Sequence, residues 1–561
     1  MKQPAASTST SNTPANFEIG ARGDTPRKRL YLLHRWLGVV TAFVGALVFF
    51  SGAIATFHSE LDAWSSRANR YPDVASLPGF NLDSAYLAAR RGIESELLES
   101  TDIAQAAGHP VSFFFHRHEP DGMGTREVGV LVELDPESLE VLSRRAGDGD
   151  DVTRATRWYA LGDFFIRLHL YLLMPETLGL ILTGTVGFAL ILLISSGIWV
   201  HRPNLKRLVR RPRSERPRFL AADTHTLLGS WSLPYTLMVA LTGAFFSFAG
   251  TVLVPAVAIV AFNGDQNALV ETLVGHVAVS ERSGTASLEA IRRDSLQRCP
   301  VCRFERVSLE SWGKREASAT VDLSSSSLTR HVERHLVYDG HDGAFLQEKP
   351  LLGTRPSLGN SVLALMADLH FGTLFGLLTK LLWAVSAVAA CGLAASGLIV
   401  FTTRSKAPHS GGTLLVRTLT IVILGGLPLS SGSSVYAWFL GIGLQLDAPL
   451  GLMALAFGVA VLATAGLGLA RWPLRKALGV ALGSAGLLFS LSPWVALSIT
   501  DLDLPQIWFD PALRPTLWVD GVLSGLGLAL LLIAGRINRM PSNAVQCSPP
   551  AIGPAQVAAG D

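Results

Sequence analysis

Charged residues are scarce in this chain of 561 residues: Asp, Glu, Lys and Arg make up only 16% of it, and hydrophobic residues make up 49%. This balance excludes an ordinary soluble globular protein of the same length. Several apolar runs reach about 20 residues, which is enough to cross a hydrocarbon core of about 30 Å. The sequence therefore predicts an α-helical integral membrane protein.

Cysteine is also sparse, with four residues in the whole chain. Cys299 and Cys302 form a CPVC motif followed by Arg303, so the CxxCH motif for covalent haem attachment is excluded. We expect a local disulfide between Cys299 and Cys302, because their segment is predicted to face an oxidising compartment. A redox-active CxxC that passes electrons remains the alternative, although a thioredoxin-like context is lacking.

Other motifs are missing as well. No GxGxxG sequence follows a strand-like segment, so no dinucleotide-binding domain is predicted. The formal net charge is only +3, and the basic residues cluster between apolar runs. These clusters are explained by membrane topology, so nucleic acid is not expected as a partner.

Basic clusters at 27–29, 201–218 and 402–406 place the loops that contain them in the cytoplasm by the positive-inside rule. Both termini are then cytoplasmic, and about eight transmembrane helices alternate consistently. The expected spans lie near 36–57, 177–200, 227–250, 373–401, 415–440, 449–470, 477–499 and 516–535.

Two long polar segments between spans are expected outside the cytoplasm. Each has a helix-like stretch followed by strand-like alternation, such as VSFFFHR at 111–117 and CRFERVSL at 302–309, and is predicted to be a small α+β insertion. The expected order is a disordered cytoplasmic tail (1–26), span 1 (27–57), insertion 1 (58–165), span 2 (166–200), a basic loop (201–226), span 3 (227–262), insertion 2 (263–360), span 4 (361–401), a loop (402–414), four C-terminal spans (415–535) and a cytoplasmic tail (536–561).

The first four spans contain a repeat marked by histidines. HRWLG at 34–38 matches THTLLG at 224–229, and Leu-His at 168–169 matches Leu-His at 369–370. Each match is followed by an apolar run that reaches a Ser-Gly or Thr-Gly pair, which we interpret as small-residue helix contacts. The four histidines that the repeat relates are His34, His169, His225 and His370.

Depth in the membrane decides which histidines can pair. His34 and His225 begin spans that rise from the cytoplasm, whereas His169 and His370 precede spans that descend from the other face. Intramembrane histidine is costly unless it is paired or ligating, and imidazole is a haem ligand. The pattern therefore predicts two b-type haems, one for each pair. The alternative is a structural role, in which interfacial histidines snorkel or form hydrogen bonds without binding a metal.

Other histidines fit less well. His58 and His201 close spans 1 and 2 but have no counterpart in the second copy, so we consider them less favoured ligands. His116 and His118 alternate on an expected strand, and we expect them to be solvated rather than bound to a metal.

Four motifs occur in order, with basic loops between them: HRWLG, LH, DTHTLLG and LHFGTLFG. Through these motifs, roughly residues 27–404 resemble the PepSY-associated transmembrane family. The two insertions resemble its PepSY domains. This resemblance implies a multi-pass protein of the bacterial inner membrane that is linked to iron acquisition. It further implies a haem-dependent reductase that transfers electrons to a periplasmic ferric siderophore. The resemblance does not identify the electron donor, for which a cytoplasmic protein and a quinol are the two candidates. The last four spans lie outside the resemblance.

Two other functions remain open from the residues. One is a transporter or permease component for a siderophore or metal, with structural histidines; a shortage of intramembrane carboxylates speaks against it. The other is a haem-free regulator that acts through its PepSY domains.

Overall fold

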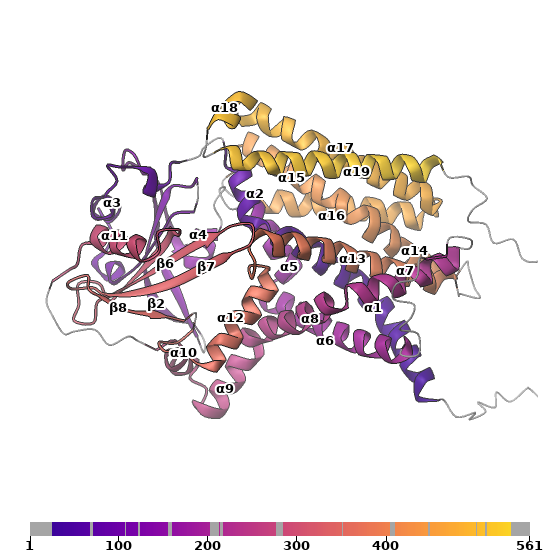
Figure 1. Cartoon of the computed structure of the whole chain (residues 1–561), viewed down its shortest axis with the longest axis horizontal. Coiled ribbons are helices and arrows are strands. Elements are labelled where there is room, and N and C mark those ends of the chain that lie inside the picture. The colour runs from indigo at the N-terminus through magenta and orange to yellow at the C-terminus, as the bar shows by residue number, and fades with distance from the viewer. Residues whose placement is uncertain are drawn as a thin grey trace, which may run out of the picture.

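The computed structural model describes residues 25–67, 71–106, 108–121, 124–154, 160–201, 212–213, 217–275, 284–350, 352–403, 410–446, 449–500, 502–510 and 513–539. Most of the predicted tails, and residues 202–211 and 214–216 of the basic loop at 201–226, lie outside these residues. Within them, eight helices are long and apolar enough to cross a membrane, which confirms the predicted fold class. They form a bundle, and an antiparallel sheet stands at one end of it (Figure 1).

The repeat region contributes the first half of the bundle. Its helices are α1 (Pro26–Ala55), α2 (His58–Ser65), α5 (Ala160–Tyr171), α6 (Glu176–His201), α7 (Pro217–Trp231), α8 (Leu233–Phe248), the π-helical turn η5 (Ala249–Leu253), α9 (Val254–Ala261), α10 (Gln266–Val274), α12 (Leu358–Phe371) and α13 (Leu377–Thr403). α1 packs against both α6 and α13, and α7 packs against α13. The helices of both copies therefore share one interior.

Spans 2 and 4 are each preceded by a short helix that a turn separates from the span. Leu172 and Leu173 both have positive φ between α5 and α6. Gly372 caps α12 with φ +74°, and its amide hydrogen-bonds to the carbonyl of Asp368. A left-handed residue of this kind is the usual end of a helix, and glycine adopts it without strain. Because of these turns, His169 and His370 lie at the ends of α5 and α12.

The two insertions build a single sheet. Its strands are β1 (Ser100–Ala104), β2 (Val111–Asp121), β3 (Gly124–Leu134), β4 (Val141–Asp148), β5 (Arg303–Glu310), β6 (Ser318–Ser326), β7 (His331–Asp339) and β8 (Phe345–Lys349). They run in the order β4-β3-β2-β1-β5-β6-β7-β8, with β1 antiparallel to β5 and Ile103 opposite Val307. Each insertion thus supplies four neighbouring strands, and β1 and β5 join them edge to edge.

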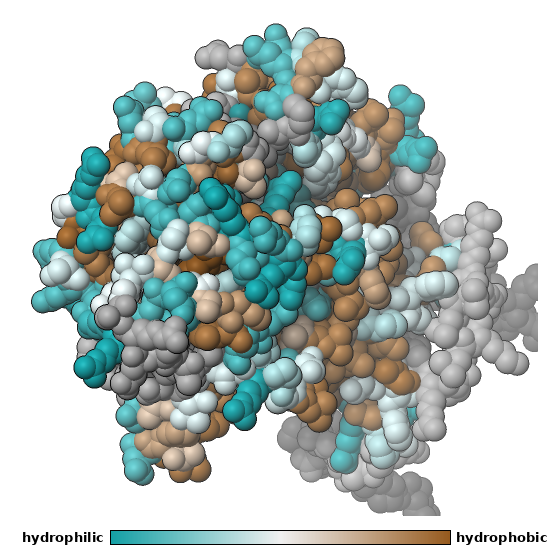
Figure 2. All heavy atoms as spheres, turned by 60° about the vertical axis from the view of Figure 1, so that its left-hand side comes forward, coloured by the Kyte–Doolittle hydropathy of each residue, from teal (hydrophilic) through white to brown (hydrophobic). Residues whose placement is uncertain are grey.

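Alternation along the strands gives this sheet one apolar face and one polar face. The apolar face packs under α3 (Leu82–Ala89) and α11 (Leu288–Arg298), which contact each other across the join. Smaller elements of this domain are η2 (Val74–Ser76), η3 (Ser95–Glu99) and α4 (Gly149–Arg154). Hydrophilic side chains cover much of the surface of this domain, whereas hydrophobic ones gather on the helices behind it (Figure 2).

The polar face holds an ion pair that makes the stability of the sheet depend on pH. The Nδ1 atom of His335 lies 2.8 Å from one carboxylate oxygen of Asp322. The other oxygen of Asp322 accepts a hydrogen bond from Arg306. The hydrogen bond with Asp322 raises the pKa of His335, so its stabilising effect is lost as pH rises through that pKa. His335 and Arg306 hold the pKa of Asp322 below its ordinary value, so Asp322 stays ionised throughout.

We therefore expect the thermal unfolding temperature of the purified protein to decrease as the pH is raised from about 6 to about 8.5. In His335→Asn this decrease with pH should be smaller. Circular dichroism measured over this range checks the prediction. An equal slope in both proteins would contradict it.

The C-terminal half is a second helical layer. Its elements are α14 (Gly411–Ile421), the π-helical turn η6 (Val422–Gly426), α15 (Leu427–Gly443), α16 (Leu450–Leu469), α17 (Leu474–Thr500), α18 (Leu504–Phe509), η7 (Arg514–Thr516) and α19 (Leu517–Arg539). This layer packs on the repeat region where α14 contacts α13 and where α15 and α16 contact α5.

A buried ion pair also links this layer to the segment after α1. Arg67 is fully buried and donates to Asp520 of α19 over 2.7 Å, and the indole of Trp64 donates to the other oxygen of Asp520. Removing one partner of a buried pair leaves an uncompensated charge. The pair therefore holds α2 and the residues that follow it to the C-terminal layer.

Replacing Asp520 with alanine should destabilise the protein by about 3–5 kcal/mol, because the guanidinium of Arg67 would stay buried without its carboxylate. Denaturant unfolding in detergent, followed by tryptophan fluorescence, measures this change. Glu96→Gln breaks a solvent-exposed pair with Arg117 and should cost at most about 1 kcal/mol. Equal costs for the two variants would contradict the prediction.

Candidate functional site

The bundle brings the four repeat histidines together in two pairs. The ring centroids of His34 and His225 are 6.2 Å apart, and those of His169 and His370 are 6.3 Å apart. His169 and His370 stand on the short helices near the sheet domain, so we call them the proximal pair; His34 and His225 are the distal pair (Figure 1). The pairing of helices from different copies is the pairing that the sequence predicts.

In the distal pair, each histidine rests on the other helix of its own copy. The Nδ1 atom of His34 lies 3.0 Å from the carbonyl oxygen of Leu193 on α6. The Nδ1 atom of His225 lies 3.0 Å from the carbonyl oxygen of Leu393 on α13. The repeat relates these two contacts to each other. In both rings, Nδ1 faces a helix of the ring's own copy and not the other histidine.

The proximal pair follows the same plan with the helix roles exchanged. The Nδ1 atom of His169 lies 2.9 Å from the carbonyl oxygen of Val48 on α1. His370 instead approaches the hydroxyl of Thr242 on α8, over 2.9 Å. The hydroxyl of Thr242 donates its hydrogen to the carbonyl of Met238, so it accepts from the imidazole.

These hydrogen bonds fix which ring nitrogen carries the proton. A carbonyl oxygen only accepts, and the Thr242 hydroxyl already uses its hydrogen, so the Nδ1 atom of each of the four rings is the donor. In a neutral imidazole the other nitrogen, Nε2, then carries the lone pair. Hydrogen bonds of this kind to the second ring nitrogen are typical of histidines that bind a metal.

A Ser-Gly or Thr-Gly pair supports every one of these histidines. A Cβ atom added to the glycine would lie between 2.8 and 3.3 Å from the histidine Cε1 atom in all four cases. At Gly52 a Cβ atom would force the ring to move, and at the other three glycines it would make an unusually tight contact with the ring. The four Ser/Thr-Gly pairs and their histidines are Ser51-Gly52 with His169, Ser196-Gly197 with His34, Thr242-Gly243 with His370, and Ser396-Gly397 with His225.

The sequence contains this signal, but its role was missed. The four pairs stand at matching places in the two copies and were interpreted as contacts between helices, whereas the structure places a histidine ring on each of them. Gly38 and Gly229 face Leu193 and Leu393, on the same helix surfaces that hold the distal pair.

The two pairs are well separated along the membrane-crossing direction. His34 and Val48 are 14 residues apart on α1, about 21 Å at 1.5 Å per residue. Aromatic rings pack between the helices in this interval: Tyr235 lies 5.4 Å from Trp383 and 6.2 Å from Phe49, measured between ring centroids. Aromatic rings therefore contribute to the packing between the two pairs.

The less favoured histidines take no part in the two pairs as far as the structure describes them. The Nδ1 atom of His58, the first residue of α2, lies 3.1 Å from the carbonyl oxygen of Ala55 at the end of α1. His201 is the last residue of α6, and its side chain lies outside the described part.

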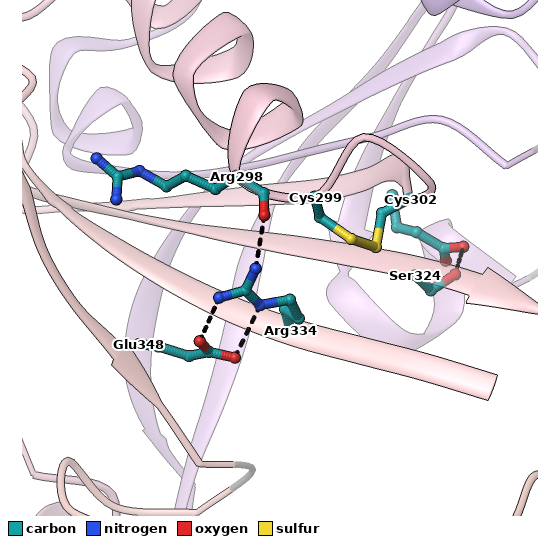
Figure 3. Close-up of a disulfide and its surroundings, with 7 residues drawn as sticks. Arg298, Cys299, Cys302, Ser324, Arg334 and Glu348 are labelled. Carbon is teal, nitrogen blue, oxygen red and sulfur yellow. Dashed lines mark hydrogen bonds and ion pairs between the residues drawn. A yellow bond between two sulfur atoms is a disulfide. The ribbon is translucent and has the colours of Figure 1, made fainter. Parts of the chain in front are cut away.

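Cys299 and Cys302 form a disulfide between the end of α11 and the start of β5 (Figure 3). Both cysteines are buried, and they stand in the sheet domain rather than beside the histidine pairs. Nearby, Arg334 donates to the carbonyl of Arg298 and pairs with Glu348, which ties β7 to α11 and β8 (Figure 3). The surroundings of the disulfide are those of a brace within one domain.

Replacing both cysteines with serine should lower the free energy of unfolding of the sheet domain by about 2 kcal/mol, the entropy expected for so short a loop. Chemical denaturation of the oxidised protein and of the double variant measures the difference. The absorbance of any cofactor in the bundle should not change. A large loss of that absorbance at full stability would instead indicate that the cysteines act on the histidine site.

Comparison with known proteins adds the family. The family described as the PepSY-associated TM region matches residues 31–404, about two thirds of the chain. The chain belongs to this family. The matched region begins in α1 and ends just after α13, so it contains both histidine pairs and the whole sheet domain but none of the C-terminal layer.

A curated relative of this PepSY-associated protein is the "Uncharacterized protein PA4219" of Pseudomonas aeruginosa. The two are 28% identical over 367 residues, which cover 59% of this chain and 87% of the relative. Most of the relative's length is therefore matched, whereas a large part of this chain is not.

Proposed function

We propose that this protein carries electrons across the membrane through two b-type haems, one held by His34 and His225 and the other by His169 and His370. The observation that supports this most is the repeated pairing of four imidazoles at 6.2 and 6.3 Å. Each pair combines one histidine from each copy, so neither copy alone has a complete ligand set.

The dimensions of the pairs fit the cofactor. Two imidazole nitrogens that bind one metal from opposite sides at about 2 Å each hold their ring centroids about 6 Å apart. Both pairs have that separation before any residue moves. The Nδ1 hydrogen bonds leave the lone pair on Nε2, the nitrogen that points away from the supporting helix.

Bound haem would supply a one-electron redox centre near each end of the bundle. The chain's own residues would do the rest. The carbonyls of Leu193, Leu393 and Val48 orient the imidazoles and increase their basicity. The Ser/Thr-Gly pairs fix how deeply each ring sits, and the rings of Tyr235 and Trp383 keep water out of the interval between the pairs.

The direction of transfer follows from the proposed topology. By the positive-inside rule, the basic clusters at the distal end support a cytoplasmic location for that end, and the sheet domain would then face the periplasm of a bacterial inner membrane. The donor would be a cytoplasmic reductase or a membrane quinol. The acceptor would approach at the proximal pair beneath the sheet domain, and the family resemblance favours a ferric siderophore, whose iron is released on reduction to Fe(II).

Haem content decides this proposal. The chain is expressed with haem precursor, purified in detergent and analysed by pyridine haemochrome and reduced-minus-oxidised spectra. We expect about two b haems per chain and their oxidation by a ferric siderophore. A colourless protein would overturn the proposal and favour transport or regulation. Two haems that a ferric siderophore does not oxidise would leave electron transfer in place and overturn only the acceptor.

A further inference from the structure

The polar face of the sheet carries a second cluster of potential ligands, remote in sequence from the four paired histidines. His116 and His118 of β2 and Glu127 of β3 each offer one ligand atom, and these atoms all lie within 4.8 Å of one another. His118 faces Glu127 across the strand pair, with 3.6 Å between its Nε2 atom and a carboxylate oxygen. Residues two apart on a strand point to the same face, so both histidines lie beside the carboxylate.

The residue opposite His116 on β3 is a glycine that the strand pairing requires. Gly129 pairs with His116 across the strands, and a Cβ atom at Gly129 would collide with the backbone of Phe115 and His116. Position 129 must therefore be glycine, and β3 places no side chain directly opposite His116.

His116 is also held in one orientation. Its ring stacks on Phe114 with centroids 4.8 Å apart and an angle of 10° between the planes, and its Nδ1 atom lies 3.2 Å from the carbonyl oxygen of Phe114. A carbonyl can only accept, so the Nε2 atom of His116 carries the lone pair. The ring is buried, whereas the other two side chains are about half exposed. One fixed imidazole thus stands beside two accessible ligands.

We infer that His116, His118 and Glu127 form a binding site for a divalent first-row transition metal in the sheet domain. Two imidazole nitrogens and one carboxylate oxygen suit Zn²⁺, Fe²⁺ or Ni²⁺ rather than Mg²⁺ or Ca²⁺, which prefer oxygen ligands alone. Three protein ligands on one face leave the remaining positions to water or to a ligand of the arriving metal. The site is independent of the proposed haems, because it uses none of their histidines.

The sequence alone favoured solvated histidines at 116 and 118. The third ligand depends on the register between β2 and β3, which places Glu127 opposite His118, and that register becomes visible only in the folded sheet.

Zn²⁺ binding to the full-length protein in detergent tests the site. After chelation and buffer exchange, the protein is dialysed against a series of free Zn²⁺ concentrations with excess Mg²⁺, and bound zinc is counted by mass spectrometry. We expect one tight Zn²⁺ per chain, about 10- to 100-fold weaker in His118→Ala and in Glu127→Gln. Both changes affect exposed side chains, so the sheet should fold normally.

Glu119→Gln is the matched control. Glu119 follows His118 on β2 but points to the opposite face and pairs with Arg117 and Arg126, so zinc affinity should not change. Haem content should be the same in all these proteins. Unaltered zinc affinity in His118→Ala and Glu127→Gln, or a wild-type protein without tight zinc, would overturn the site without affecting the haem proposal.

Discussion

Replacing His370 with alanine should leave the purified protein with about one haem per chain instead of two. His370 lies 6.3 Å from His169, and no other histidine of the described residues shares this pair. The distal pair stands about 21 Å away along α1 and rests on different helices, so its haem should be retained. Electron transfer to an acceptor on the sheet side should be lost, because the proximal redox centre is the last one before that side.

Haemochrome analysis gives the haem count, and stopped-flow oxidation of the dithionite-reduced protein gives the transfer rate. His58→Ala is the control: His58 also lies near this end of the bundle, but its imidazole bonds to the carbonyl of Ala55, three residues earlier in the chain. This variant should keep both haems. Two haems per chain in His370→Ala would reject the ligand assignment.

Gly52→Val should abolish the proximal haem as completely as removal of His169 itself. A Cβ atom at position 52 would lie 2.8 Å from the Cε1 atom and 2.9 Å from the Nδ1 atom of His169. The imidazole would have to move away from α1 and give up its hydrogen bond to Val48, so it could no longer meet the ligand geometry. The histidine itself is unchanged in this variant, which therefore tests its support and not its identity.

Gly45→Ala provides the comparison on the same helix. Its new methyl group would be 3.9 Å from Leu190 and 4.0 Å from Val186, which is ordinary packing distance. We expect two haems in Gly45→Ala and about one in Gly52→Val, read from the same spectra. If both variants keep two haems, the Ser/Thr-Gly pairs are helix contacts only.

The spans and the histidine pairs could be predicted because local rules decide both. An apolar run of sufficient length has to be a helix in lipid, and equal depth along such helices determines that His34 meets His225. The support for each ring could not be predicted in the same way. It depends on the rotation of one helix against another, which places Gly52 rather than Gly45 under His169.

Long-range pairing was likewise invisible in the sequence. The sequences of β1 and β5 do not predict that these strands join the two insertions into one sheet, because any exposed strand edge can pair with another. Trp64 and Arg67 also gave no sign of Asp520, more than 450 residues later. Such contacts come from the packing of layers and not from a period in the sequence.

The spacing of residues on α1 sets the relative position of the two histidine pairs. His34, a distal ligand, and Gly52, which supports the proximal one, are 18 residues apart, or about five complete turns at 3.6 residues each, so they share one azimuth. The second copy keeps the same interval between His225 and Gly243. A single residue inserted between His34 and Gly52 would rotate one of these two positions by about 100° around the helix axis relative to the other. The length of this stretch should therefore tolerate less change than its composition.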